Sequence, residues 1–543
     1  MSNQLNGVIL EEDIFQKVHI YKGIAFNNTI IEYNNILDYF RLSAKKYPDS
    51  PFIIEVVDGN EKEIVSYRTA YSMVHKLAYY VKENYDIHLD SRVAILPSNS
   101  CESFYMILAI LLCEAVVVII NPNEPLERIK SQIYTLECSN IFVDSSYFHL
   151  IDNNIIVIKE VIKALDNASP NKEVIPSIKN EQAAIIMYTT GTTSTSKPIL
   201  QMHYNVAVNC YALMKNHNLV NKTRLICTLP IFYANGLEFT LFAVMMAGAS
   251  VVLCNKFDPL SFLKVLQKYE VNIASLVPSM LNTLAEVKNP PELKSLNYFV
   301  TAAAPLSKLT SNLIWDKFNK RIVQGYGLTE TTNFSTLLPN NLSEQDYITL
   351  MLESNIPSVG SELFGNEVVI LDSMGNIIDD GSEGEICMRG HNIMAGYINN
   401  PEANKECFKG GWFHSGDLGK FIRVGNHQNR KFLCITGRIK NIIKTNGQAL
   451  SLDEIDRIIL NILGVKDCVT CGIYDNYAGE VPVCLIVKDS NFLTEEIILN
   501  YLSKNFSKEK LPRKILFTES IPRTKNGKLN RSSIANQFFL KSW

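Results

Sequence analysis

Two patterns of apolar and polar positions alternate along most of the chain. Short apolar runs with the length and composition of buried strands occur at 183–188 (AAIIMY), 249–254 (ASVVLC) and 296–302 (LNYFVTA). The segment 259–270 (PLSFLKVLQKYE) instead repeats its apolar residues every three or four positions, which is typical of an amphipathic helix. Since strands that alternate with helices usually form parallel sheets, the pattern predicts an α/β fold with mainly parallel sheets.

The longest strongly apolar run covers residues 106–120 (MILAILLCEAVVVII). It is shorter than the roughly 20 residues that a membrane-spanning helix needs, and it contains Glu114. We therefore predict a buried helix followed by a strand, and no transmembrane segment. The N-terminus (MSNQLNGVILEEDIF) is acidic and lacks the basic and apolar regions of a secretion signal, so we expect a cytoplasmic protein.

A change of pattern marks the last part of the chain. The polar stretch 421–432 (FIRVGNHQNRKF) is expected to be a surface loop. Amphipathic helices are predicted after it at 451–463 (SLDEIDRIILNIL) and 494–506 (TEEIILNYLSKNF), with short strands around them. These elements predict a small C-terminal domain that contains both helices and strands.

Composition and charge exclude some classes of function. A chain of 543 residues is expected to form more than one domain, and a net charge of −3 gives no general affinity for nucleic acid. Twelve cysteines without a secretion signal indicate reduced thiols. One CxxC pair, Cys468 and Cys471, lies in a strand-like segment, where such positions face opposite sides, so a structural role is favoured over a redox or zinc site.

Candidate chemistry appears first at residues 185–203 (IIMYTTGTTSTSKPILQMH). Gly191 and Lys197 have the spacing of a Walker phosphate-binding loop, but Ser196 replaces its second glycine and Pro198 replaces its magnesium-binding hydroxyl. The remaining hydroxyl and backbone donors suit a nest that wraps phosphates. A solvated turn rich in serine and threonine explains this stretch alone equally well.

Motifs further along the chain favour the phosphate interpretation. They are QGYGLTET (324–331), GWFHSGDLG (411–419), TGRIKNIIKTNGQ (436–448) and IPRTKNGKLNR (521–531), with weaker matches in LPIFYANG (229–236), TAAAPL (301–306), GSEGEICMRG (381–390) and AGYINNPEA (395–403). In this order they resemble the adenylate-forming superfamily of AMP-binding enzymes, which includes acyl- and aryl-CoA synthetases and luciferases. The resemblance covers nearly the whole chain.

The resemblance implies a domain organisation and a two-step reaction. A large N-terminal region of several subdomains is expected over 1–436, and a small mobile α+β domain over 437–543, with a hinge near 438–441 at Lys440. In this family a carboxylate attacks the α-phosphate of ATP, and a thiol then displaces AMP from the acyl-adenylate. The implied cofactors are ATP, Mg²⁺ and CoA, and phosphoryl transfer of this kind depends on positioning and charge neutralisation.

The same resemblance assigns roles to residues around the phosphates. The β- and γ-phosphates would be held by Thr190, Gly191, Thr192, Thr193 and Lys197. Thr329 would contact the α-phosphate, and Glu330 would hold Mg²⁺, which prefers carboxylate oxygen. Lys528 would bridge the acid and the α-phosphate, where a flexible positive charge offsets two approaching anions.

A second group of residues is implied around the nucleoside. Tyr326, flanked by Gly325 and Gly327, would stack on adenine, with the backbone of Ala303 and Ala304 on its other side. Asp417 would accept hydrogen bonds from both ribose hydroxyls, with Arg438 assisting it.

Departures from the family pattern bear on the acid and on the acceptor. The acid pocket is expected at Tyr233 and Gly236, and tyrosine stands where amino-acid-activating relatives carry aspartate. Because tyrosine is not anionic at neutral pH, an α-amino acid is disfavoured. The aromatic residues Phe232, Phe239 and Phe242 favour an apolar acid.

These inferences together predict an acid–thiol ligase that activates a fatty or aromatic acid and transfers it to CoA. Two alternatives remain open at this point. One is a ligase that loads the phosphopantetheine of a free-standing carrier protein, since Ala449 and Leu452 depart from the family in the segment that shapes the thiol tunnel. The other is a non-catalytic nucleotide-binding homologue, against which Lys528, Glu330, Asp417 and Arg438 argue.

Overall fold

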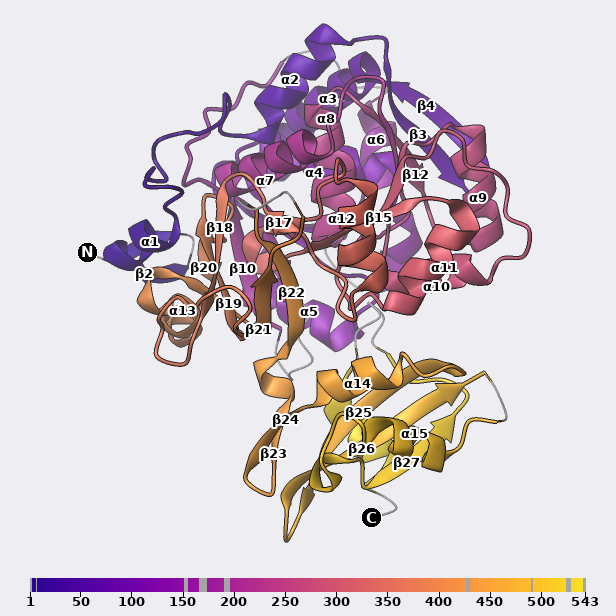
Figure 1. The fold of residues 1–543 in the computed structure, drawn as a ribbon. Coiled ribbons are helices and arrows are strands. Elements are labelled where there is room, and N and C mark those ends of the chain that lie inside the picture. The colour runs from indigo at the N-terminus through magenta and orange to yellow at the C-terminus, as the bar shows by residue number, and fades with distance from the viewer. Residues whose placement is uncertain are drawn as a thin grey trace.

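The computed structural model describes residues 2–5 (backbone only), 7–150, 155–165, 173–189, 196–425, 430–489, 492–523 and 529–540. Most of the chain forms a large body, and the last hundred or so residues, orange to yellow in Figure 1, form a small one below it. Five residues predicted for the site lie outside the described residues: Thr190, Gly191, Thr192, Thr193 and Lys528.

A seven-stranded sheet forms one layer of the large body. Its strand order is β20 (Gly396–Tyr397), β10 (Pro198–Met202), β9 (Ala183–Tyr188), β6 (Val116–Ile119), β5 (Arg92–Leu96), β7 (Asn140–Val143) and β8 (Ile155–Val157). The strands from β9 to β8 are parallel, whereas β10 and β20 are antiparallel additions at one edge. The helices of this region are α3 (Tyr67–Tyr85), α4 (Cys101–Leu112), α5 (Leu126–Thr135), α6 (Ile158–Leu165) and α7 (His203–Asn216).

The apolar run at 106–120 forms the second half of α4 and all of β6, so the predicted buried helix and strand are confirmed. Ser100 begins α4 by accepting a hydrogen bond from the backbone N–H of Ser103. Within the part of the chain that the structure describes, no helix combines the length and apolarity needed to cross a membrane.

A nine-stranded sheet forms the other main layer. Its order is β17 (Ser361–Glu362), β16 (Thr336–Leu337), β15 (Arg321–Tyr326), β14 (Tyr298–Thr301), β13 (Ile273–Leu276), β11 (Arg224–Cys227), β12 (Ser250–Cys254), β3 (Pro51–Val57) and β4 (Asn60–Ser66). From β15 to β3 all neighbours are parallel, which confirms the predicted α/β class. The helices of this region include α2 (Ile36–Lys46), α9 (Pro259–Lys268), α10 (Pro278–Glu286) and α11 (Lys308–Phe318).

The helix predicted at 259–270 is α9, and its first residues explain where it begins. The side chain of Asp258 accepts a hydrogen bond from the backbone N–H of Ser261, and Pro259 occupies the first turn. The strands predicted at 183–188, 249–254 and 296–302 correspond to β9, β12 and β14. Local periodicity was therefore sufficient to predict these elements.

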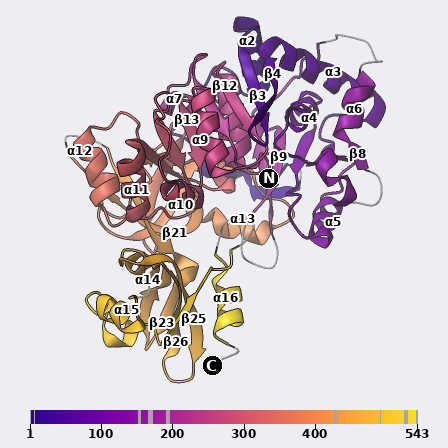
Figure 2. The same ribbon diagram turned by 90° about the vertical axis from the view of Figure 1, so that its right-hand side faces the viewer.

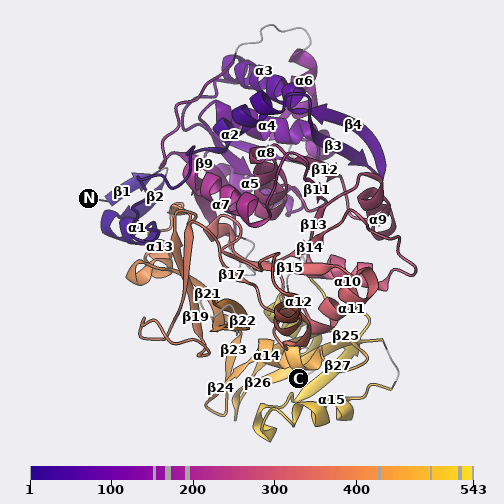
Figure 3. The ribbon, with the colours of Figure 1, turned by 45° about the horizontal axis from the view of Figure 1, so that its top comes forward.

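A four-stranded antiparallel sheet was not predicted. It contains β18 (Asn366–Leu371), β19 (Gly384–Gly390), β21 (Phe413–Ile422) and β22 (Phe432–Arg438). β21 and β22 extend into the stretch 421–432, so the predicted surface loop is shorter than expected. Figures 1 and 3 show β22 leading directly into the small C-terminal body.

The C-terminal body is an α+β unit, as predicted. Its elements are β23 (Ile442–Thr445), β24 (Gln448–Ser451), α14 (Leu452–Ile459), β25 (Val465–Asp475), β26 (Gly479–Lys488), α15 (Glu495–Leu502), β27 (Lys514–Thr518) and α16 (Arg531–Phe538). Helices α14 and α16 are labelled in Figure 2. Cys468 packs in a core with Ile455 of α14, while Cys471 packs in a different core with Ile534 of α16. The two thiols are free and buried, which supports their structural interpretation.

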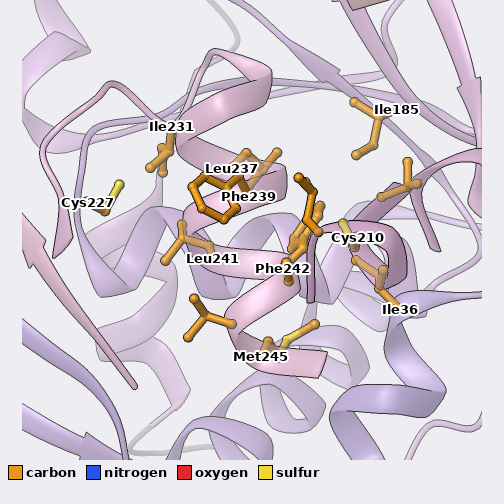
Figure 4. Close-up of a cluster of buried hydrophobic side chains, with 14 of the residues drawn as sticks. Ile36, Ile185, Cys210, Cys227, Ile231, Leu237, Phe239, Leu241, Phe242 and Met245 are labelled. Atoms are coloured by element: carbon orange, nitrogen blue, oxygen red, sulfur yellow. The ribbon is translucent and has the colours of Figure 1, made fainter. Parts of the chain in front are cut away.

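A π-helix, η2 (Asn235–Ala243), lies at the centre of the large body. Figure 4 shows its residues Leu237, Phe239, Leu241 and Phe242 among other buried apolar side chains. Phe239 stacks on His217 at 4.8 Å between ring centroids, and both phenylalanines are fully buried. These two aromatic residues belong to the hydrophobic core, so they do not by themselves support an apolar acid.

Candidate active site

The predicted nucleoside-binding residues lie at one edge of the nine-stranded sheet. Ala303 and Ala304 follow β14, and Gly325 and Tyr326 end the neighbouring parallel strand β15. In open α/β sheets, ligands bind at the carboxyl ends of the strands. Ala303 is exposed and has a φ of 71°, an uncommon conformation for a residue with a side chain.

Gly327 allows the chain to turn sharply after β15. A Cβ atom at this position would lie 1.7 Å from the carbonyl oxygen of Asn333, so no larger residue fits. At Gly325 a Cβ atom would lie 2.4 Å from the ring of Phe334. The two glycines therefore permit the close approach of the segment that follows the turn.

The antiparallel sheet brings Asp417 and Arg438 to the end of β15. These residues are paired across β21 and β22, and Asp417 is 3% exposed. The hydroxyl of Tyr326 donates a hydrogen bond to Oδ2 of Asp417 (2.8 Å), and Nε of Arg438 forms an ion pair with Oδ1 (2.7 Å). Burial, and then the charge of Asp417, raise the pKa of Tyr326 well above its usual range, so the phenol remains a donor.

A second cluster joins the phosphate-loop lysine to the predicted metal ligand. Tyr397 of β20 donates a hydrogen bond from its hydroxyl to Oε1 of Glu330 (2.9 Å). Nζ of Lys197 lies 4.8 Å from the centroid of the same ring, in a cation–π contact. The backbone N–H of Met394 donates to the carbonyl of Glu330 (2.8 Å) and fixes its position. Sequence reasoning did not assign a role to Tyr397, although it lies in the quoted match AGYINNPEA.

The ends of the phosphate loop are held together by β9 and β10. The backbone N–H of Thr189 donates to the carbonyl of Lys197, and the N–H of Lys197 donates to the hydroxyl of Thr189, both at 2.9 Å. Pro198 begins β10, a position that proline tolerates in a sheet. The loop that carries the predicted phosphate contacts therefore begins and ends beside the Lys197–Tyr397–Glu330 cluster.

The donor set of this cluster fits Mg²⁺. Glu330 is partly exposed at the start of the turn η3 (Thr329–Thr331), and its carboxylate is the kind of oxygen ligand that Mg²⁺ prefers. A hydrogen bond from Tyr397 orients this carboxylate without neutralising it.

Tyr233 lies between β11 and the π-helix η2, and Gly236 lies in the first turn of η2. The hydroxyl of Tyr233 accepts a hydrogen bond from Asn121 (3.4 Å), and burial raises its pKa to about 12. The phenol is therefore neutral, which agrees with the argument against an ammonium-bearing substrate. At Gly236 a Cβ atom would lie 2.4 Å from the carbonyl oxygen of Pro230, so glycine is needed for this close packing.

A partly buried ion pair between His414 and Glu385 supports the segment before Asp417. Nδ1 of His414 donates to Glu385 (2.7 Å), and Nε2 donates to the carbonyl of Lys409 (3.0 Å). Glu385 also accepts from the backbone N–H of Gly416 (3.0 Å). With Cys387 these ligand atoms lie within 4.8 Å of one another, but both nitrogens of His414 already have protein partners. The cluster therefore acts as a hydrogen-bonded support for β21.

We expect this pair to make stability depend on pH. The hydrogen bond to Glu385 raises the pKa of His414, so this contribution is complete below the unfolded value of about 6.5 and is lost as pH rises through the raised value. Burial opposes ionisation of Glu385, but hydrogen bonds from His414 and Gly416 lower its pKa, so this contribution is lost in acid.

The measurement is the free energy of unfolding at about pH 6 and about pH 9 for the wild type and His414→Gln. The wild type should lose about 1 kcal/mol more than the variant over this interval. Equal losses in the two proteins would show that the pair does not titrate as described.

Residues 438–441 form a turn that is attached to the C-terminal body. Lys440 is exposed in the 3₁₀ turn η6 (Ile439–Asn441). Asp453 accepts hydrogen bonds from the backbone N–H of Arg438 (2.9 Å) and from the side chain of Asn441 (3.0 Å), and it forms an ion pair with Arg531. Asp453 was missed because a first-turn aspartate of a helix is common without any such role.

Comparisons with known proteins identify the family. The AMP-binding enzyme family matches residues 40–398, and the AMP-binding enzyme C-terminal domain matches residues 454–528. An oxalate–CoA ligase of Saccharomyces cerevisiae is 30% identical over 70% of this chain and 68% of its own length. A 4-coumarate–CoA ligase of Nicotiana tabacum is 27% identical over 88% of this chain and 90% of its own. The ATP-bound crystal structure of MatB from Rhodopseudomonas palustris shares the fold, with a TM-score of 0.82 at 23% identity over 92% of this chain and 98% of that one.

The chain therefore belongs to the family of AMP-binding enzymes. It is an AMP-forming acid–thiol ligase, which confirms the reaction class predicted from its motifs.

Proposed function

We propose that the enzyme activates a carboxylic acid without an α-amino group to an acyl-adenylate and transfers the acyl group to CoA. One observation carries this proposal. The Tyr326–Asp417–Arg438 cluster and the Lys197–Tyr397–Glu330 cluster both adjoin the segment that runs from the end of β15 to η3. The first cluster suits a nucleoside, and the second suits phosphates and their counterion.

In the first half-reaction, a carboxylate oxygen attacks the α-phosphorus of ATP and pyrophosphate leaves. Asp417, already oriented by Tyr326 and Arg438, would accept the ribose hydroxyls. Lys197 would neutralise charge on the leaving phosphates, and Lys528 would do so between the acid and the α-phosphate. Glu330 would hold Mg²⁺, which supplies further neutralisation of the phosphates when bound.

In the second half-reaction, the thiol sulfur of CoA attacks the acyl carbon, and AMP leaves with its new oxygen. We propose that the domain over 437–543 rotates between the two steps about the turn at Lys440. The support is that β22 ends at Arg438, and that Arg438 and Asn441, on either side of Lys440, both donate hydrogen bonds to Asp453 of the C-terminal body.

Replacing Lys440 with proline tests the hinge. Proline fixes φ near −65° and removes a backbone donor, so it restricts the dihedral change that a rotation needs. We expect pyrophosphate release in a single turnover to continue, while thioester formation falls about tenfold or more. The two half-reactions are measured separately, with Lys508→Ala, an exposed lysine of the same body, as the control. Unimpaired thioester formation by Lys440→Pro would exclude a hinge at this position.

The acid is proposed to bind beside Tyr233. The residue follows β11 in the sheet whose carboxyl ends carry the nucleoside cluster, and its phenol is neutral. Tyr233→Ala should therefore change the order of kcat/KM values among acids by about tenfold, while the KM for ATP changes little. An unchanged order of acids would place the pocket elsewhere.

A panel of carboxylic acids tests the proposed function as a whole. Pyrophosphate release is followed with each acid, with and without CoA, and acyl-CoA is assayed directly. The proposal predicts acid-dependent pyrophosphate release and sustained turnover only with CoA. Acyl-adenylate formation without acyl-CoA would point to a carrier-bound acceptor, and no release with any acid would contradict the proposal.

A further inference from the structure

Glu238 is an ionisable residue in the centre of the hydrophobic core. It lies on the π-helix η2, between Leu237 and Phe239, and it is 0% exposed. Among the residues that the structure describes, neither of its carboxyl oxygens has a hydrogen-bond partner. Burying an ionised carboxylate without a compensating charge or hydrogen-bond donor costs several kcal/mol of stability. The carboxyl of Glu238 is therefore expected to be neutral or to have such a partner.

The side chain next to Glu238 is that of Gln201, which comes from β10. Nε2 of Gln201 donates to the carbonyl of Thr329 (3.2 Å) and to the carbonyl of Thr332 (3.3 Å). An amide nitrogen has two hydrogens, and both are used by these carbonyls. Because carbonyls only accept, the amide cannot be turned to face them with its oxygen.

Oε1 of Gln201 is therefore the atom left to meet the carboxyl of Glu238. This oxygen also has no donor among the described residues. A carboxylate beside it would place two acceptors together, whereas a carboxylic acid would donate a hydrogen bond to it. Burial raises the pKa of Glu238 well above its usual range and outweighs the lowering that the neighbouring Gln201 contributes, so the net direction agrees with a bound proton.

The turn that Gln201 holds is strained. Thr332 has a φ of 67°, which is rare for a β-branched residue, and it is fully buried. Its hydroxyl donates to the carbonyl of Asn392 (2.7 Å). Strained conformations persist only where surrounding contacts fix them, and this turn carries Thr329 and Glu330.

We propose that Glu238 is a positioning residue: its carboxylic acid donates a hydrogen bond to Gln201, and Gln201 in turn holds the turn of Thr329 and Glu330. This proposal rests on the proposed function for the importance of that turn. It adds Gln201 and Glu238, which are distant in sequence from Thr329 and Glu330, as residues that set the geometry of the groups expected to contact the phosphates and Mg²⁺.

Two methionine variants and one glutamine variant test the proposal. Glu238→Met and Gln201→Met keep the approximate volume of the side chain but remove the hydrogen bonds that are proposed to link Glu238, Gln201 and the turn. Glu238→Gln keeps a neutral hydrogen-bond donor of the same shape. Ser311→Ala is the control, because Ser311 is also fully buried and its hydroxyl donates to a backbone carbonyl, within helix α11. Pyrophosphate release, the KM for ATP and thermal stability are measured for each.

We expect kcat to fall about tenfold in each methionine variant, with the KM for ATP little changed, because a small displacement of reacting groups is costly. Glu238→Gln should stay within about twofold of the wild type, with the same pH profile and the same preference among acids. The double methionine variant should be no worse than the poorer single one. Ser311→Ala should alter stability alone.

Three results would overturn the proposal. Glu238→Gln could be as impaired as Glu238→Met, the methionine variants could retain full kcat, or Glu238→Gln could change the acid preference. The last result would mean that Glu238 acts on the substrate as an anion.

A second readout does not depend on the reaction. The infrared spectrum of the wild type at neutral pH should contain a protonated-carboxyl band that Glu238→Gln lacks. Absence of this band contradicts the proposal even if the enzyme ligates acids to CoA. Its presence supports the proton on Glu238 even if no acid in the panel is activated.

Discussion

Replacing Asp417 with alanine is expected to raise the KM for ATP about a hundredfold. The variant loses the oxygens that would accept both ribose hydroxyls, and each hydrogen bond to a charged group contributes about 1.5–3 kcal/mol. The substitution also removes the hydrogen-bond acceptor of the Tyr326 hydroxyl and the ion-pair partner of Arg438. We therefore expect weaker binding of both ATP and AMP, measured by initial rates and by calorimetry.

Asp380→Ala provides the matched control. Asp380 lies between β18 and β19 and pairs with Arg423 (2.7 Å) and Lys431 (2.9 Å), so its removal also breaks ion pairs of the antiparallel sheet. Its KM for ATP should remain close to that of the wild type. If Asp417→Ala and Asp380→Ala had the same KM for ATP, Asp417 would have no part in nucleotide binding.

Replacing Lys528 with alanine is expected to lower the rate of acyl-adenylate formation about 10²–10³-fold. Lys528 lies outside the described residues, and its role is inferred from the motif IPRTKNGKLNR. A positive charge between two approaching anions is worth most in the transition state, and removing one such donor typically costs this much. Thioester formation from supplied acyl-adenylate should be largely retained, because that step would use the rotated domain.

Rapid-quench measurement of each half-reaction separates the two effects. Lys508→Ala, an exposed lysine of the same domain, should leave both rates unchanged. Equal damage to both half-reactions in Lys528→Ala would reject its assignment to the first step.

The sequence predicted those parts of the fold that depend on local pattern. The strand β9, the helix α9 and the pair α4 and β6 each carry their own periodicity, so they could be predicted without knowledge of their neighbours. The antiparallel sheet of β18, β19, β21 and β22 could not be predicted, because its strands have mixed burial and their pairing depends on contacts distant in sequence.

The residues of the candidate site also divide into those that the sequence predicted and those that only the folded structure shows. Tyr326, Asp417 and Arg438 were singled out from motifs, and the structure brings them together by pairing β21 with β22 beside β15. Tyr397, by contrast, joins Lys197 to Glu330 only through the antiparallel edge strand β20. The aromatic character of Phe239 was counted in favour of an apolar acid, yet packing places this side chain in the core.

The contact between Gln201 and Glu238 had no signal in the sequence. Each residue interrupts an apolar segment, and an isolated polar residue there is usually explained by solvent or by a backbone partner. Only the folded structure places Gln201, which donates to the carbonyl of Thr329, next to the buried carboxyl of Glu238.

Oxygen transfer from the acid to AMP tests the central claim most directly. In acyl-adenylate chemistry a carboxylate oxygen bonds to the α-phosphorus, and it stays there when the thiol displaces AMP. An acid labelled with oxygen-18 in its carboxylate, incubated with the enzyme, ATP, Mg²⁺ and CoA, should therefore give AMP that carries one labelled oxygen and pyrophosphate that carries none. Label in inorganic phosphate, or unlabelled AMP alongside acyl-CoA, would contradict the account.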